Sequence, residues 1–189
     1  MPKPIRPTLK QHRAKYGSCT ECELCQTRNR IVLGRGGVPC DVMFIGEAPG
    51  TSENALGKAF IGPAGKLLDD MIASSKIHLE WEYREFFSNL IACIPLDDAG
   101  SKVKQPPKKA IKACRGRLDH LVKVARPKAI VRVGKVSTAN YEHKTLPMCD
   151  IIHPAAILRA DVTQKQMAIQ QTVLKLVDFL EELSNAQAS

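Results

Sequence analysis

Short apolar segments alternate with longer amphipathic segments along most of the chain, and this alternation constrains the fold more than any other feature. The apolar segments have the length of strands, and the segments between them carry apolar residues at helical spacing. Strands that alternate with helices form a parallel sheet that helices cover on both faces. We therefore expect an α/β fold, a three-layer αβα sandwich around a central four-stranded parallel sheet. The expected strands are 41–46, 86–93, 129–133 and 148–152, and the expected helices are 62–75, 108–125 and 164–183.

The length and composition of the chain favour a single globular domain. It has 189 residues, of which 44% are hydrophobic and 25% are charged. Residues 1–16 are basic and contain three prolines, so we expect a loose basic arm before a domain over residues 17–185. The arm lacks the apolar core of a secretory signal, and no other segment is long and apolar enough to cross a bilayer. We therefore expect a cytoplasmic protein that does not bind membranes.

The chain carries a large excess of positive charge. Its formal net charge is +9, with basic residues concentrated in the ranges 3–15, 28–35, 102–117 and 123–135. Such an excess favours a polyanionic partner such as nucleic acid, although solubility alone would explain it too.

Unusual polar residues follow the expected strands at their carboxyl ends. Glu47 follows the first strand, Asn89 lies in the second, Lys135 follows the third and His153 follows the fourth. The carboxyl ends of parallel strands meet at one edge of a sheet, where ligands of such folds bind. Each residue alone has an ordinary explanation as a surface or turn residue, but together they predict one polar pocket.

The chain has seven cysteines, and their spacing suggests metal ligation. Cys19 and Cys22 have the two-residue separation of zinc and iron–sulfur sites, and Cys93 and Cys114 supply a second pair. Cys25 is an alternative ligand to Cys22. Four thiolates at this spacing suit either zinc or a [4Fe–4S] cluster, and the spacing does not separate the two.

Six segments in a fixed order resemble the family 4 uracil-DNA glycosylases of the uracil-DNA glycosylase superfamily. They are Cys19–Leu24, Gly46–Gly50, Gly57–Gly65, Asn89–Cys93, Pro127–Gly134 and His153–Arg159. The resemblance implies a parallel sheet between helices, in agreement with the pattern of strands and helices. It also implies a monofunctional base-excision repair enzyme that hydrolyses the N-glycosidic bond of uracil in single- or double-stranded DNA and leaves an abasic site. We expect it to act as a monomer.

The resemblance also implies a cofactor. The ligand pattern of the family falls on Cys19, Cys22, Cys93 and Cys114, where the family holds a [4Fe–4S] cluster, and this favours iron–sulfur over zinc. In the family the cluster is structural and fixes a loop of the DNA-binding face.

Catalytic roles follow from the same resemblance. Asn89 is expected to pair with uracil, Phe60 to stack on the base, and His153 to donate a hydrogen bond to uracil O2 as negative charge develops there. Glu47 is expected to orient water or to stabilise the positive charge on the sugar, and Glu53 to support that network.

Further residues are expected to contact the substrate through the backbone or at the DNA surface. Backbone N–H groups near Ala48 would assist the pocket. Leu158 would enter the DNA as an apolar wedge and Arg159 would bind phosphate, while Lys135 and Ser137 are expected phosphate contacts at a helix start.

The chain also departs from the family pattern. The segment between Gly134 and His153 is short, and Cys93-Ile-Pro-Leu replaces the usual Cys-Arg-Pro-Pro. Two alternatives therefore accompany the uracil hypothesis. One is a catalytically weak or inactive DNA-binding or accessory module of the same fold, and the other is a glycosylase for another deaminated base.

Overall fold

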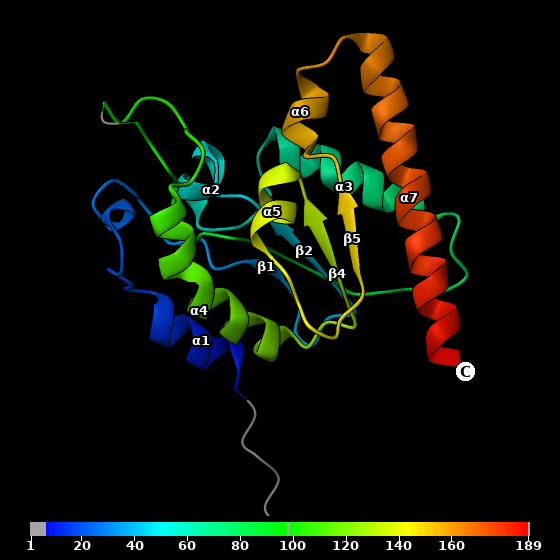
Figure 1. Ribbon diagram of the computed structural model, residues 1–189, viewed down its shortest axis with the longest axis horizontal. Helices are drawn as coiled ribbons and strands as arrows, with labels where there is room; N and C mark the ends of the chain where they lie inside the picture. The colour runs from blue at the N-terminus through cyan, green and yellow to red at the C-terminus, as the bar shows by residue number, and fades with distance from the viewer. Residues whose placement is uncertain (1–6, 98, 189) are drawn as a thin grey trace, which may run out of the picture.

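A five-stranded sheet forms the centre of the molecule (Figure 1). This computed structural model describes residues 7–97 and 99–188. The strands lie in the order β1-β3-β2-β4-β5, and all neighbours are parallel except β1 and β3. The strands are β1 (Arg35–Gly36), β2 (Val42–Gly46), β3 (Glu85–Asn89), β4 (Ala129–Val133) and β5 (Met148–Ile151). The four expected parallel strands are confirmed, and a two-residue antiparallel strand extends one edge.

Helices cover both faces of the sheet, which confirms the three-layer arrangement. In Figure 1, α3 and α7 lie on one side of the strands and α1 and α4 lie on the other. The helices are α1 (Leu9–Tyr16), α2 (Thr51–Leu56), α3 (Pro63–Lys76), α4 (Lys108–Ala125), α5 (Lys135–Asn140), α6 (Pro154–Leu158) and α7 (Val162–Ala188), with a 3₁₀ turn at Glu23–Cys25.

Two apolar clusters hold the layers together, because alternate residues of each buried strand face opposite sides. Phe44 and Val131 face the layer of α3 and α7, where Leu68 and Leu180 meet them. The neighbouring strand residues face the other layer, where Leu118 of α4 is buried. Continuously buried strands are typical of a parallel sheet with both faces covered.

The structure corrects the expectation of a loose arm over residues 9–16. These residues form α1, which begins at a capping box between Thr8 and Gln11 and packs against α4. The prolines favour irregular structure, but the capping pair satisfies free N–H groups at the helix start and thereby stabilises a helix. Residues 1–6 lie outside the described part of the chain.

Smaller differences concern the ends of the elements. β3 ends at Asn89, so residues 90–93 leave the sheet instead of continuing the expected strand. The expected closing helix 164–183 extends over Val162–Ala188, and the short helices α2 and α6 were not expected.

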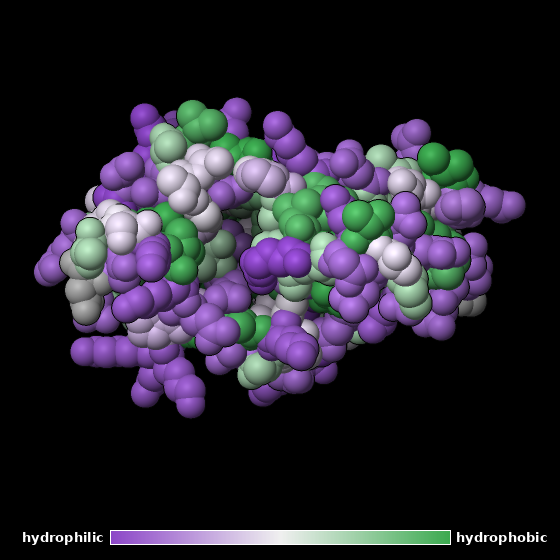
Figure 2. Space-filling model, turned by 90° about the horizontal axis from the view of Figure 1, so that it is seen from above, coloured by the Kyte–Doolittle hydropathy of each residue, from purple (hydrophilic) through white to green (hydrophobic). Residues whose placement is uncertain are grey.

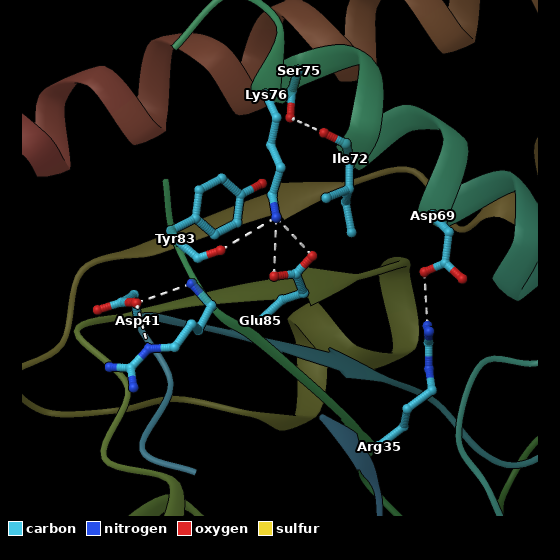
Figure 3. A network of polar contacts seen from close by, with 9 residues as sticks. Arg35, Asp41, Asp69, Ile72, Ser75, Lys76, Tyr83 and Glu85 are labelled. Carbon is cyan, nitrogen blue, oxygen red and sulfur yellow. Dashed lines mark hydrogen bonds and ion pairs between the residues drawn. The ribbon is translucent and has the colours of Figure 1, made fainter. Parts of the chain in front are cut away.

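Ion pairs connect α3 to the strands that it covers (Figure 3). Arg35 of β1 lies 2.7 Å from Asp69, and Lys76 at the end of α3 lies 2.9 Å from Glu85 at the start of β3. The Arg35 guanidinium also lies 4.1 Å from the centre of the Phe87 ring. Partly exposed ion pairs add little stability individually, so their main effect is to fix the short edge strand in its register.

The carboxyl edge of the sheet is open. The arrowheads of β4 and β5 point toward the top of Figure 1, and Figure 2 looks onto that edge and shows a hollow between the flanking elements. Among the described residues, no helix combines the length and the apolar character that a bilayer crossing requires.

A histidine pair lies where α1 meets α4. His12 is fully buried, and its Nδ1 lies 2.9 Å from Nδ1 of His120. Burial, followed by the positive charge of Arg117, lowers the pKa of His12 to about 4. His12 is therefore uncharged at neutral pH, as its position between two helices requires.

This burial predicts a pH-dependent stability. Unfolded His12 has a pKa of about 6.5, so its contribution is complete above that pH and is lost as the pH falls toward about 4. We expect the free energy of unfolding, measured by urea denaturation, to decrease over this window and His12→Leu to reduce the decrease. His78→Leu changes an exposed histidine and should keep the pH dependence of the parent. An unchanged slope in His12→Leu would assign the acid sensitivity elsewhere.

Candidate active site

A cavity of about 670 Å³ opens at the carboxyl edge of the sheet, at the position of the hollow in Figure 2. Its walls come from loops and helix ends that follow β2, β3 and β5 and from α2 and α3. Seven of the predicted site residues line it: Glu47, Ala48, Glu53, Phe60, Asn89, His153 and Arg159. Of the four residues that predicted one pocket, Glu47, Asn89 and His153 share this cavity, and Lys135 does not line it.

Asn89 and Phe60 converge at the bottom of the cavity. Asn89 ends β3 and pairs in register with Gly46, the last residue of β2. A methyl group on Gly46 would lie 2.5 Å from both Asn89 Oδ1 and the tip of the Phe60 ring. Glycine is therefore required here for close approach, and its absent side chain lets an amide and an aromatic ring share one narrow space.

Phe60 occupies a strained backbone conformation. Its φ is 53°, in the left-handed region that non-glycine residues rarely adopt. The backbone of Phe60 packs directly against Gly65, where any side chain would collide with it. Phe60 is only 6% exposed and also packs against Phe87, so it belongs both to the core and to the cavity wall. Such strain is characteristic of functional positions.

Glu53 holds the loops of the pocket together. Its carboxylate accepts hydrogen bonds from the N–H groups of Ile61 and Gly62, at 2.8 and 2.7 Å, and from that of Gly50 at 3.1 Å. Its side chain is buried at the first turn of α2. Glu53 therefore positions the two segments that carry Glu47 and Phe60, and its expected support of the catalytic network stays a prediction.

Glu47 presents the free carboxyl group of the pocket. It follows β2 and is half-buried, and burial raises the pKa of Glu47 above its usual value. Within the described ranges of the chain, Glu47 forms no ion pair with a lysine, arginine or histidine. Its side chain is therefore available for a water molecule or for a developing positive charge.

One ring nitrogen of His153 accepts a hydrogen bond from the backbone of α6, and the other has no hydrogen-bond partner among the described residues. His153 is the N-cap of α6, where its Nδ1 accepts the N–H of Ala155 at 3.1 Å. In a neutral ring the proton then lies on Nε2, which becomes a hydrogen-bond donor. Burial lowers the pKa of His153 below its usual value, and the charge of Arg159 lowers it further. Both effects favour the neutral form.

The residues expected at the DNA surface differ in their exposure and in the cavity that they line. Leu158 is 38% exposed at the end of α6, next to Arg159 on the cavity wall. Lys135 is exposed at the start of α5 and lines a neighbouring cavity. Ser137 was predicted wrongly as a phosphate contact: it is fully buried, and its hydroxyl donates to the Ile45 carbonyl at 2.6 Å. On a six-residue helix its position faces the sheet, not solvent.

The loop between β3 and α4 contributes to the cavity wall, which was not foreseen from the sequence. Val103, Lys104 and Gln105 belong to the loop between β3 and α4 and form part of the cavity wall. A single bridge between Leu96 and Val103 folds this loop back on itself. The basic composition of the loop was visible in the sequence, but its direction depends on the pairing of Leu96 with Val103.

The four predicted cysteine ligands line a second, small cavity of about 40 Å³: Cys19, Cys22, Cys93 and Cys114. Burial raises the pKa of Cys22, and neighbouring Cys114 and Cys19 contribute to the increase, because the thiols lie close together. Cys25 does not line the cavity, so Cys22 is the better placed of the two alternatives. Within residues 7–97 and 99–188, no three His, Cys, Asp or Glu side chains are arranged to hold one metal ion.

Two arginines border this cavity of thiols. Arg28 donates to Cys93 Sγ at 3.3 Å and to the Cys19 carbonyl at 2.7 Å, so it bridges two of the cysteine segments. Arg117 is 3% exposed, and its buried Nε has no hydrogen-bond partner. Neither arginine has a carboxylate partner in the described ranges. Buried cations require a compensating charge, so the cavity fits an anionic metal–thiolate centre.

Comparisons with known proteins identify the relatives of the chain. The profile of the Uracil DNA glycosylase superfamily matches residues 33–177. A type-4 uracil-DNA glycosylase of Thermotoga maritima is 32% identical over 181 residues, which cover 87% of this chain and 90% of that protein. The type-4 uracil-DNA glycosylases of Sulfurisphaera tokodaii and Archaeoglobus fulgidus are 36% and 33% identical over 69% and 62% of this chain. The chain spans little more than half the length of these archaeal relatives, 56% and 55%.

The two acids of the pocket should respond differently to truncation. Glu53→Ala removes the acceptor of three backbone N–H groups and should lower the free energy of unfolding by about 2–4 kcal/mol in urea denaturation. Glu47→Ala should stay within about 1 kcal/mol of the parent, because a partly buried carboxylate without a charged partner contributes little to folding. Equal losses in both variants would contradict the division into a supporting and a free acid.

Proposed function

The chain belongs to the uracil-DNA glycosylase superfamily, and on this basis we propose that it hydrolyses the N-glycosidic bond of uracil in DNA and leaves an abasic site. The observation that carries the proposal is the convergence of the Asn89 amide and the Phe60 ring above Gly46. The cavity thus joins an amide to an aromatic ring, the two kinds of group that a planar polar base requires for pairing and stacking. The target base would enter it after leaving the DNA stack.

Asn89 is proposed to identify the base. Its amide offers one carbonyl acceptor and an NH₂ donor, and within the described ranges no protein group engages either. The carbonyl would accept N3–H of uracil while the NH₂ donates to O4. Cytosine presents the opposite pattern and would pair only with the amide turned by 180°, so discrimination by several orders of magnitude requires that the Asn89 amide is held in the orientation that pairs with uracil.

Phe60 is proposed to stack on the base and to limit the size of the site. Its ring is fixed by the strained backbone at φ 53° and by contact with Phe87. A rigid ring reduces the entropy that ordering a flexible side chain would cost on binding.

His153 and Glu47 are proposed to stabilise the charges of the transition state. The Nε2–H of His153 would donate to uracil O2 as the departing base gains negative charge. Glu47 lines the same cavity, where its carboxylate would orient the attacking water or stabilise positive charge on the sugar. Backbone N–H groups near Ala48 would assist, while Leu158, Arg159 and Lys135 would contact the DNA around the flipped nucleotide.

The four cavity cysteines are proposed to hold a [4Fe–4S] cluster. When bound, this group supplies a rigid cross-link between segments that are distant in sequence. The shared cavity of Cys19, Cys22, Cys93 and Cys114 supports one centre held by four thiolates. We further propose a monomer that acts on single- or double-stranded DNA.

The activity is testable with a labelled oligonucleotide that contains one uracil. The purified protein should produce a site that breaks only after alkali treatment, and Asn89→Ala, purified in parallel, should be slower by at least about a hundredfold because the amide contacts are lost. Strand breakage without alkali would contradict the monofunctional reaction. No abasic product on either single- or double-stranded substrate, from protein with its metal bound, would reject uracil as the base.

The cluster is testable by substitution of individual cysteines. Cys22→Ala and Cys114→Ala should lose iron and the visible absorption near about 400 nm that is typical of protein-bound [4Fe–4S] clusters. Cys25→Ala and Cys149→Ala serve as matched controls, because neither residue lines the cavity. Stoichiometric zinc without visible absorption in the parent would replace iron–sulfur with the zinc alternative.

A further inference from the structure

Arg117 lies between the cavity of the cysteines and the bottom of the pocket. It belongs to α4, three residues after Cys114 and therefore on the same side of the helix. It lines the cysteine cavity. Its guanidinium donates to the backbone carbonyl of Asn89 at 2.5 Å, to that of Leu90 at 3.1 Å and to the Ser88 hydroxyl at 3.2 Å. One side chain thus contacts both sites.

The hydrogen bonds of Arg117 fix the end of β3. The strand β3 ends at Asn89, although the N–H groups of Leu90 and Ile91 still donate to the carbonyls of Gly46 and Glu47. The carbonyls of Asn89 and Leu90 accept no bond from the sheet, and Nη2 of Arg117 donates to both of them while Nη1 donates to the Ser88 hydroxyl. The direction of the Asn89 side chain depends on this segment of backbone.

The charge of Arg117 requires a partner that no described side chain supplies. The group is 3% exposed and has no ion pair with a carboxylate in the described part of the chain, and its Nε is unpaired. The nearest histidine, His12, is buried and uncharged at neutral pH. A metal centre held by four thiolates carries net negative charge, and it would lie on the side where the charge is uncompensated.

We propose that Arg117 is a positioning residue that couples the metal centre to base recognition. Its guanidinium compensates the charge of the metal–thiolate centre on one side and anchors the backbone of Asn89 on the other. The coupling to uracil rests on the proposed function, whereas the two physical contacts of Arg117 do not. The metal centre therefore contributes to the geometry of the pocket through a single buried side chain, in addition to cross-linking the chain.

Two substitutions separate the two roles of Arg117. Arg117→Lys keeps the charge but replaces the planar fork by one ammonium group, and Arg117→Met removes both charge and fork at similar length. Lys123→Met removes the same charge from the exposed face of α4 and is the matched control. Release of metal to a colorimetric chelator should be faster by about tenfold in Arg117→Met and close to the parent in Arg117→Lys and Lys123→Met.

The anchoring of Asn89 is tested by a double-mutant cycle in single-turnover uracil excision with excess enzyme. Arg117→Lys and Arg117→Met should each slow excision by about tenfold or more in the parent background. In the Asn89→Ala background they should add little, because Arg117 acts through Asn89. Losses that multiply would show a general structural defect and overturn the coupling.

Hydrogen exchange tests the role of Arg117 at the end of β3 without a measurement of catalysis. The amides of Leu90 and Ile91 bond to the carbonyls of Gly46 and Glu47 at the end of β3. Both Arg117 variants should accelerate exchange there by about tenfold without changing β5. If the parent does not excise uracil, the proposed function fails while exchange and metal release still decide the role of Arg117. Unchanged exchange and unchanged metal release in Arg117→Met would reject the proposal.

Discussion

The pocket depends on the parallel register of β2 and β3. This register pairs Gly46 with Asn89, so the residue with the recognising amide lies beside the residue that has no side chain. A shift by one residue would turn Asn89 toward the opposite face of the sheet and place a buried side chain in the pocket. Sheet pairing, hydrophobic packing and the geometry of the pocket are therefore not separate properties of this molecule, because the same hydrogen-bonded ladder sets all three.

Two buried charged side chains fix the backbone of the segments that follow the strands. Glu53 accepts hydrogen bonds from backbone N–H groups of two loops. Arg117 donates hydrogen bonds to backbone carbonyls at the end of β3. Each group satisfies several backbone atoms that secondary structure leaves free, which is a common reason for retaining a charge in a protein interior. The carboxylate of Glu47 and the amide of Asn89 line the same cavity and hold no backbone group within the described residues. The protein thus separates side chains that build the pocket from side chains that act in it.

The sequence was sufficient for the layers of the fold and for most of the pocket. Parallel strands repeat a local pattern, and their carboxyl ends must share an edge, so the meeting of Glu47, Asn89 and His153 followed from strand order. The failures concern features that local patterns do not encode. Ser137 looked like a phosphate ligand because a serine near a helix start is typical of such sites, but the rotation of α5 turns it toward β2. Arg117 was not recognised, although its spacing from Cys114 is visible, because its importance arises from carbonyls brought to it by the fold.

The backbone floor of the pocket limits how the range of accepted bases can evolve. Gly46 and Gly65 already lack side chains and are in close contact with Phe60, so no substitution at either position can enlarge the space. A bulkier base, such as a purine or a pyrimidine with a 5-methyl group, would gain room only through a smaller residue at position 60 or through displacement of the main chain. The first change removes the stacking surface, and the second disturbs the central strands. Broader specificity would therefore have to develop at the rim, in the loop that contains Val103, Lys104 and Gln105, while the floor stays the same.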